Sequence, residues 1–159
     1  MYALGPALLV FAARGAGPNV LTSAGERWLH WLSAELTRRA NATPVPESSL
    51  LVLWDVLEEW LDSEGFQSTL IGGSAELPDP YHPVHTAVSA NRELLRRLLE
   101  RLATEAGAAD PHGLAYQLQL LFEGAVVGAL IDGRPQVTRV ARHLARLALE
   151  ASGCTSSGA

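Results

Sequence analysis

Two histidines and two carboxylates form the only cluster of metal-type ligands in the sequence. Glu76 and Asp79 lie shortly before His82 and His85, which have the spacing His-x-x-His. Two histidines at this spacing at the start of a helix, with a carboxylate as third ligand, could bind one transition metal ion. The spacing is not diagnostic, and helix-entry capping and packing explain the same residues. We therefore predict neither a metal site nor a cofactor.

The sequence offers little for catalysis. Glu58 and Glu59 are adjacent and therefore point in different directions on a helix, which argues against a paired acid and base. The chain has no Gly-x-Ser-x-Gly elbow, no phosphate-binding loop and no His-Glu-x-x-His motif. We predict that the chain has no catalytic residues and is not an enzyme.

Four tryptophans offer binding chemistry instead. Trp28, Trp31, Trp54 and Trp60 lie on just two of the predicted helices. An indole ring has a large apolar area and one N–H donor. Both features suit the wall of a cavity that binds a flat or apolar ligand. Aromatic residues at helical spacing also fill ordinary protein cores. Both interpretations stay open for each tryptophan.

The composition limits the partners of the chain. It has 159 residues, a formal net charge of -5, and 12 basic residues, all of them arginines scattered along several segments. This distribution lacks the one-sided basic surface that is typical of a DNA-binding module. The single cysteine, Cys154, cannot form an intrachain disulfide. We predict a cytoplasmic domain without direct contact to nucleic acid.

The most apolar stretches do not predict a membrane segment. Residues 1–13 have no basic residue before their apolar part, as a signal peptide would. Residues 124–131 are far fewer than the roughly 20 that span a bilayer. We therefore expect no membrane partner.

Periodicity and helix-boundary residues predict an all-α fold. A capping box of Ser23 and Glu26 marks a helix start, Gly107 marks a helix end, and Asp110 followed by proline marks another start. About six helices are expected, at 24–39, 47–62, 66–77, 84–106, 111–131 and 135–151. The predicted organisation is an irregular arm at 1–22, a helical domain at 23–152 and a disordered tail at 153–159.

The last two predicted helices carry residues for close packing. Gly124 and Gly128 place small residues one turn apart, as do Ala125 and Ala129, and this allows helices to approach closely. The final helix has arginines on one side (Arg139, Arg142 and Arg146) and a continuous apolar stripe on the other: Val137, Val140, Ala141, Leu144, Leu147 and Ala148. Packing within the chain and pairing with a second chain both explain the small residues.

Short motifs follow one another along most of the chain. They are Gly-Glu-Arg-Trp at 25–28, Leu-Glu-Glu-Trp-Leu at 57–61, Ser-Glu-Gly-Phe at 63–66, Ala-Glu-Leu-Pro-Asp-Pro at 75–80, His-Pro at 82–83, Ala-Gly-Ala-Ala-Asp-Pro at 106–111 and Leu-Phe-Glu-Gly-Ala at 121–125. Their order and spacing, over about residues 23–152, resemble the C-terminal domain of TetR/AcrR-type transcriptional regulators.

The resemblance implies a helical effector-binding and dimerisation domain, whose last two helices pair with their copies in a four-helix interface. We expect a hydrophobic or aromatic effector to bind among the first, second, fourth and fifth helices, lined by Trp31, Trp54, Leu57, Phe66, Leu70, Leu98, Tyr116 and Phe122. We expect a homodimer that forms through Gly124, Val127, Gly128, Ile131, Val140, Leu144 and Leu147.

In such regulators, a three-helix DNA-binding unit with a helix-turn-helix precedes this domain. The 22 residues before Ser23 are too few and too rich in glycine and proline to build that unit, so we expect no DNA binding by this chain alone. Two other roles stay open. One is a binding protein that forms heterodimers with a full-length TetR-type regulator, and the other is a helical scaffold reused as an enzyme.

Overall fold

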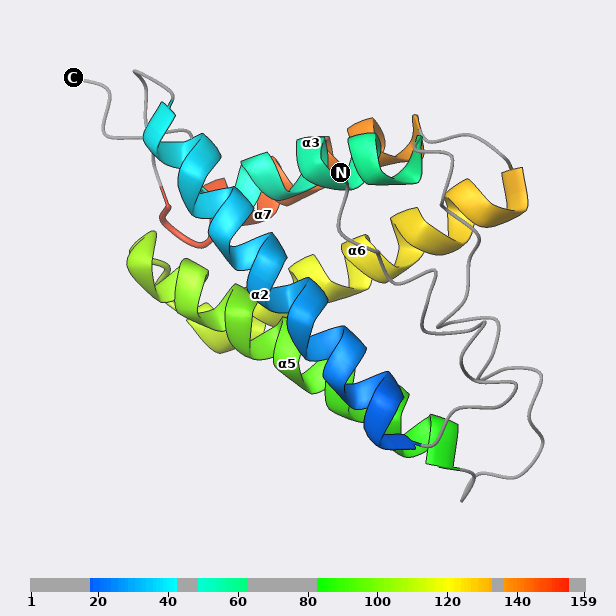
Figure 1. The fold of residues 1–159 in the computed structure, drawn as a ribbon. Coiled ribbons are helices and arrows are strands. Elements are labelled where there is room, and N and C mark those ends of the chain that lie inside the picture. Colours follow the sequence, from blue (N-terminus) through cyan, green and yellow to red (C-terminus); the bar gives the residue numbers. More distant parts are fainter. Residues whose placement is uncertain (1–17, 43–48, 63–82, 133–135, 155–159) are drawn as a thin grey trace. The chain divides into compact units, whose positions relative to one another are not determined.

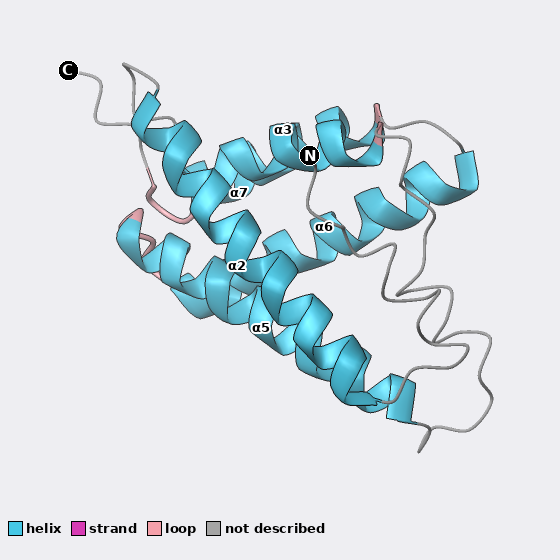
Figure 2. Cartoon of the chain, viewed as in Figure 1, coloured by secondary structure: helices cyan, strands magenta, loops and turns pink. Residues whose placement is uncertain are grey.

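The chain is helical throughout the described part of a computed structural model, which covers residues 18–42, 49–62, 83–132 and 136–154. These ranges contain five helices and no strand. The helices are drawn in Figures 1 and 2. The helices are α2 (Pro18–Ala42), α3 (Ser49–Leu61), α5 (Pro83–Glu105), α6 (Pro111–Asp132) and α7 (Val137–Ala151). The predicted all-α class is confirmed. The predicted helix at 66–77 lies outside the described residues.

The first helix begins earlier than predicted. α2 starts at Pro18, so that Ser23 and Glu26 lie inside the helix and the predicted capping box at its start was wrong. Proline suits the first helical position, because its fixed φ is helical and its missing N–H would have no partner there. A capping-box motif spans only four residues, and the same four residues can also lie in the interior of a longer helix. The motif alone therefore does not fix where a helix begins.

Most other helix boundaries agree with the predictions. Gly107, with φ 77°, ends α5: its N–H donates to the Thr104 carbonyl, and the Ala108 N–H donates to the Ala103 carbonyl. This is the paired Schellman arrangement that a left-handed glycine permits. At the start of α6, the Asp110 side chain accepts a hydrogen bond from the Gly113 N–H at 2.9 Å. The predicted N-cap is therefore confirmed.

The chain divides into two compact units. The first includes α2 up to Leu32 and α5 up to Leu95, and the second includes the rest of these two helices together with α3, α6 and α7. The buried side chains that are described in the first unit are Leu29, Leu32, Asn91 and Leu95. Most of the described core belongs to the second unit.

The second unit is built around α3. Eight side chains of this helix are buried: Leu50, Leu51, Val52, Leu53, Trp54, Val56, Leu57 and Leu61. Such a helix must be covered on several sides, and both α6 and α7 pack against it as well as against each other. α7 contributes mainly small buried side chains, namely Thr138, Ala141 and Ala145, together with Leu149. Small side chains let its backbone lie close to its neighbours.

The predicted apolar stripe of α7 divides into two faces. Ala141 is buried, whereas Val140, Leu144 and Leu147 are exposed to solvent. The arginines were predicted to lie opposite the apolar stripe, and two of them contact α3. Arg139 pairs with Glu58 at 2.9 Å and Arg142 with Asp55 at 3.2 Å, both on α3. The small face and the arginines thus hold α7 on α3, and the larger apolar side chains are left outside.

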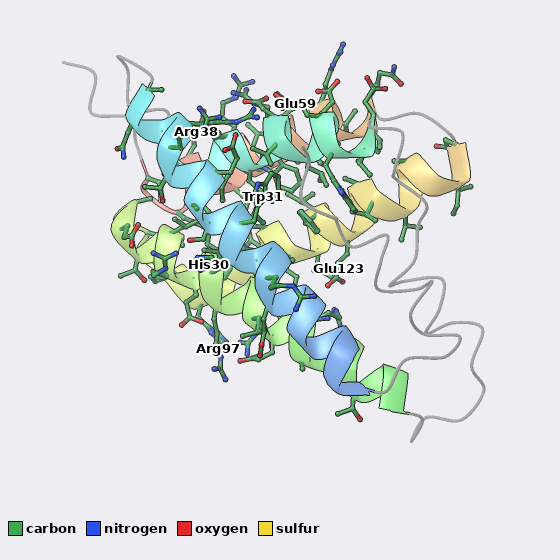
Figure 3. The ribbon with its side chains drawn as sticks, in the orientation of Figure 1. His30, Trp31, Arg38, Glu59, Arg97 and Glu123 are labelled. Atoms are coloured by element: carbon green, nitrogen blue, oxygen red, sulfur yellow. The ribbon has the colours of Figure 1, made fainter. Side chains whose placement is uncertain are left out.

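An ion-pair network joins the end of α2 to α3 within the second unit. Arg39 donates to Glu35 on its own helix at 2.6 Å and, through both terminal nitrogens, to Glu59 at 2.6 and 2.7 Å. Arg38, labelled with Glu59 in Figure 3, donates twice to Glu35 at 2.9 and 2.6 Å. These hydrogen bonds, from Arg38 first and Arg39 second, lower the pKa of Glu35 to about 2.

We expect Glu35 to stabilise the fold in a pH-dependent way. Because folding lowers its pKa from 4.5, the stabilisation is complete above that pH and is lost as the pH falls towards 2. Glu35→Gln should lower the free energy of unfolding by about 1 kcal/mol near neutral pH, and the loss should shrink in acid. Urea denaturation at several pH values measures this difference.

Glu105 provides the control for this prediction. It contacts Arg101 at 3.5 Å, and both side chains are exposed, so Glu105→Gln should change the stability less. A loss for Glu35→Gln that is the same in acid as at neutral pH would contradict the role of its charge.

Candidate functional site

Trp54 lies at the centre of the second unit. Its side chain is 1% exposed, and its ring contacts that of Phe122 on α6, with the ring centroids 6.5 Å apart and the planes tilted by 50°. This tilted geometry is one that aromatic pairs prefer. Leu57 and Leu98 are also buried. Among the predicted effector-binding residues, the structure therefore brings Trp54 and Phe122 into contact.

The indole N–H of Trp54 has no hydrogen-bond partner among the described residues. A buried donor without an acceptor loses its bond to water and gains nothing in return, at a cost of about 1–3 kcal/mol. Buried polar groups in native proteins nearly always have a partner in the protein or in ordered water. The Trp54 N–H is thus a donor available to an acceptor atom that reaches the core.

The other predicted effector residues differ in position. Trp31 is half-buried on the part of α2 that belongs to the first unit, and Phe66 and Leu70 lie outside the described residues. Tyr116 is half-exposed on α6, where the Arg96 guanidinium lies 5.0 Å from its ring centroid. His112 meets the same ring edge-on at 5.2 Å. This surface position does not support Tyr116 as part of a buried cavity wall.

Most of the predicted dimer residues of α6 and α7 are exposed. The most exposed large side chains among them are Ile131 (78%), Val140 (61%), Leu147 (47%) and Leu144 (44%), while Val127 is half-buried. Val140, Leu144 and Leu147 follow the i, i+4, i+7 spacing of one helix face. We call Val127, Ile131, Val140, Leu144 and Leu147 the apolar face. Large apolar side chains that lie exposed on one helix face are typical of interaction surfaces.

The two glycines of α6 have different surroundings. A Cβ placed at Gly128 would lie 3.2 Å from Cγ2 of Val137, whereas a Cβ at Gly124 would meet nothing within 4 Å. Gly128 therefore allows close packing of α6 against the residue that begins α7. Gly124 is exposed and leaves room for an approaching helix. Packing within the chain therefore explains Gly128 but not Gly124.

Sequence reasoning missed a polar side chain in the first unit. Asn91 is 8% exposed on α5, and neither atom of its amide has a hydrogen-bond partner among the described residues. The available signal was its position, because Asn91 lies three and four residues before Leu94 and Leu95, at the spacing of one helix face.

The candidate metal ligands Glu76, Asp79 and His82, for which we predicted no metal site, lie outside the described residues, as does the side chain of His85. Within the described ranges, no group of three or more histidine, cysteine or acidic residues could hold a metal ion. No helix in those ranges is both long enough and apolar enough to cross a membrane.

Comparisons with known proteins identify the fold. No protein-family model matches the chain. The chain is 26% identical over 120 residues to the HTH-type transcriptional regulator YjdC of Escherichia coli strain K12, and equally to YjdC of Shigella flexneri. The match covers 75% of this chain and 63% of each relative, so the chain spans less than two thirds of their length. Both relatives are regulators, in agreement with the prediction that the chain is not an enzyme.

A solved structure extends this likeness. The crystal structure of a TetR-family transcriptional regulator from Streptomyces coelicolor superposes with a TM-score of 0.68 at 22% sequence identity, over 89% of this chain and 76% of that one. A TM-score of this size over most of both chains indicates a shared fold. The chain therefore has a TetR-like fold.

Proposed function

We propose that the chain is the effector-sensing and dimerisation region of a TetR-like transcriptional regulator. The TetR-like fold and the two HTH-type relatives support a regulatory role. In this proposal the core of the second unit binds a small apolar molecule, and the apolar face of α6 and α7 pairs with a second copy of the chain.

In this proposal, the described helices do not contact DNA directly. Phosphate binding needs arginines that are available on one face. Several arginines of the second unit are instead paired with carboxylates, among them Arg38 with Glu35, Arg39 with Glu59 and Arg139 with Glu58. Their positive charge is therefore already largely balanced within the fold.

The observation that carries effector sensing is the unpaired indole N–H of Trp54. Trp54 lies on α3, whose other buried residues are leucines and valines, and its ring contacts that of Phe122. Such a site suits a flat apolar molecule with one oxygen acceptor. The hydrogen bond would fix the orientation of the molecule, and the rings would supply most of the contact area.

Two probes that differ only in the acceptor test this proposal. Acetophenone has a carbonyl oxygen, and ethylbenzene has nearly the same shape without it. We expect the wild-type protein to bind acetophenone about fivefold more tightly, as one net hydrogen bond of about 1 kcal/mol predicts. Trp54→Phe should remove this preference, because phenylalanine retains an aromatic ring but has no N–H. Isothermal titration measures both affinities.

Trp60 provides a matched control on the same helix. Trp60→Phe makes the same change at a half-buried position, and it should leave the preference for acetophenone intact. If Trp54→Phe kept the preference, Trp54 would not be the donor. If the wild-type protein showed no preference for acetophenone, the proposed sensing site would lose its support.

A further inference from the structure

Asn91 is the one described residue whose side-chain donor and acceptor are both buried without a partner. Its amide can donate two hydrogen bonds and accept two. Leu95, one turn later, is buried as well, so the amide lies on the inward side of α5 rather than at the surface. Water at the protein surface therefore does not satisfy this group.

Gln119 is a buried amide that does have a hydrogen-bond partner within the chain. It is 4% exposed on α6, and its Nε2 donates to Oε1 of Glu123, labelled in Figure 3, at 2.9 Å. Asn91 is buried to a similar extent but has no equivalent neighbour among the described residues. A buried amide without partners destabilises a fold, and a leucine of similar shape would avoid this cost. Because no described residue satisfies the Asn91 amide, a bound ligand is a candidate for its partner.

We propose that Asn91 is the polar anchor of a ligand site in the first unit, and that its ligand carries an uncharged group that both donates and accepts a hydrogen bond, such as a primary amide. This inference rests on the proposed function, because it assumes that the chain binds an effector. The Asn91 Oδ1 accepts from the ligand N–H, and the Asn91 Nδ2 donates to the ligand oxygen. An uncharged group is required because a charge at this depth would itself need a partner.

Benzamide and acetophenone test the inference, because benzamide has an amide NH2 where acetophenone has a methyl group. We expect the wild-type protein to bind benzamide about fivefold more tightly, and Asn91→Leu to abolish that preference. Without ligand, Asn91→Leu should melt at the same temperature as wild type or higher, since it removes an unpaired amide. Gln119→Leu is the control, and it should melt at a lower temperature because it removes the donor to Glu123.

Three results would overturn the inference. These are an equal affinity of the wild-type protein for the two probes, a benzamide preference that persists in Asn91→Leu, and a loss of stability or folding in Asn91→Leu like that in Gln119→Leu. The last result would mean that the amide has a structural partner. The change in acetophenone preference that Trp54→Phe causes and the mass of the dimer do not depend on the Asn91 amide. If they stand while the benzamide preference is absent, this inference alone fails.

Discussion

Leu144→Arg is expected to convert a dimer into a monomer. Leu144 is 44% exposed in the single chain, so its replacement leaves the core of that chain intact. In a dimer formed through the apolar face, the same position is covered by the second copy. Light scattering at micromolar concentration should give twice the chain mass for the wild-type protein and the single-chain mass for the variant.

The size of this effect follows from the symmetry of the proposed dimer. A C2 interface contains each residue twice, so one substitution places two arginines in the contact. An unpaired charge that is buried costs about 3–5 kcal/mol, and each 1.4 kcal/mol is about tenfold in affinity. We therefore expect the dimer to weaken by at least about 100-fold. Unchanged far-UV circular dichroism would show that the helices of the variant remain formed.

Glu150→Arg separates the effect of position from that of charge. Glu150 is exposed on the same helix but lies outside the apolar face, and its substitution changes the net charge more than Leu144→Arg does. It should leave the dimer intact. A wild-type protein of monomer mass would refute the proposed dimer, and a dimer that survives Leu144→Arg would assign the contact to another surface.

Signals in the sequence predicted the helices of the second unit well. Asp110 and Gly107 marked boundaries that the structure confirms, because capping hydrogen bonds and a positive φ depend on residues close together in the chain. The start of α2 could not be predicted in this way. A capping-box motif and a helix that passes through it have the same local sequence, and Pro18 proved to be the actual start.

The faces of α7 show what periodicity cannot decide. Its apolar positions form a wide sector, and hydrophobicity alone does not say which part of the sector meets the core. The structure buries the narrow side with Ala141 and Ala145 and exposes Leu144. The choice depends on shape, because small side chains fit closely against α3, and on the acidic residues of α3 that pair with the arginines beside them. Both are tertiary properties.

The aromatic residues of the candidate site could be named from the sequence, whereas its unpaired polar groups could not. Trp54 and Phe122 come from different predicted helices, and the structure brings their rings together. The exposure of Tyr116 depends on which face α6 turns outward, and the sequence of α6 is apolar nearly all round. The unpaired amide of Asn91 is visible only once the neighbours of α5 are known.

Trp54→Ala is expected to give the largest loss of stability among the substitutions considered. The side chain is 1% exposed, and it contacts the Phe122 ring in the core of the second unit. Replacing a buried aromatic residue by alanine removes its transfer free energy and leaves a cavity, at a cost of about 3–5 kcal/mol. This is a large share of the 5–15 kcal/mol that typically stabilises a domain, roughly a fifth or more. Urea denaturation monitored by circular dichroism measures the loss.

Trp60→Ala is the matched control, because it removes the same side chain from the same helix at a half-buried position. Its loss should be clearly smaller, since part of the indole already faces solvent. Equal losses would contradict the central packing role of Trp54. Trp54→Phe retains a ring against Phe122 and should keep most of the stability while it loses the N–H donor. Comparing the alanine and phenylalanine variants therefore separates the contribution of Trp54 to the core from its contribution to a ligand, because only the second depends on the donor.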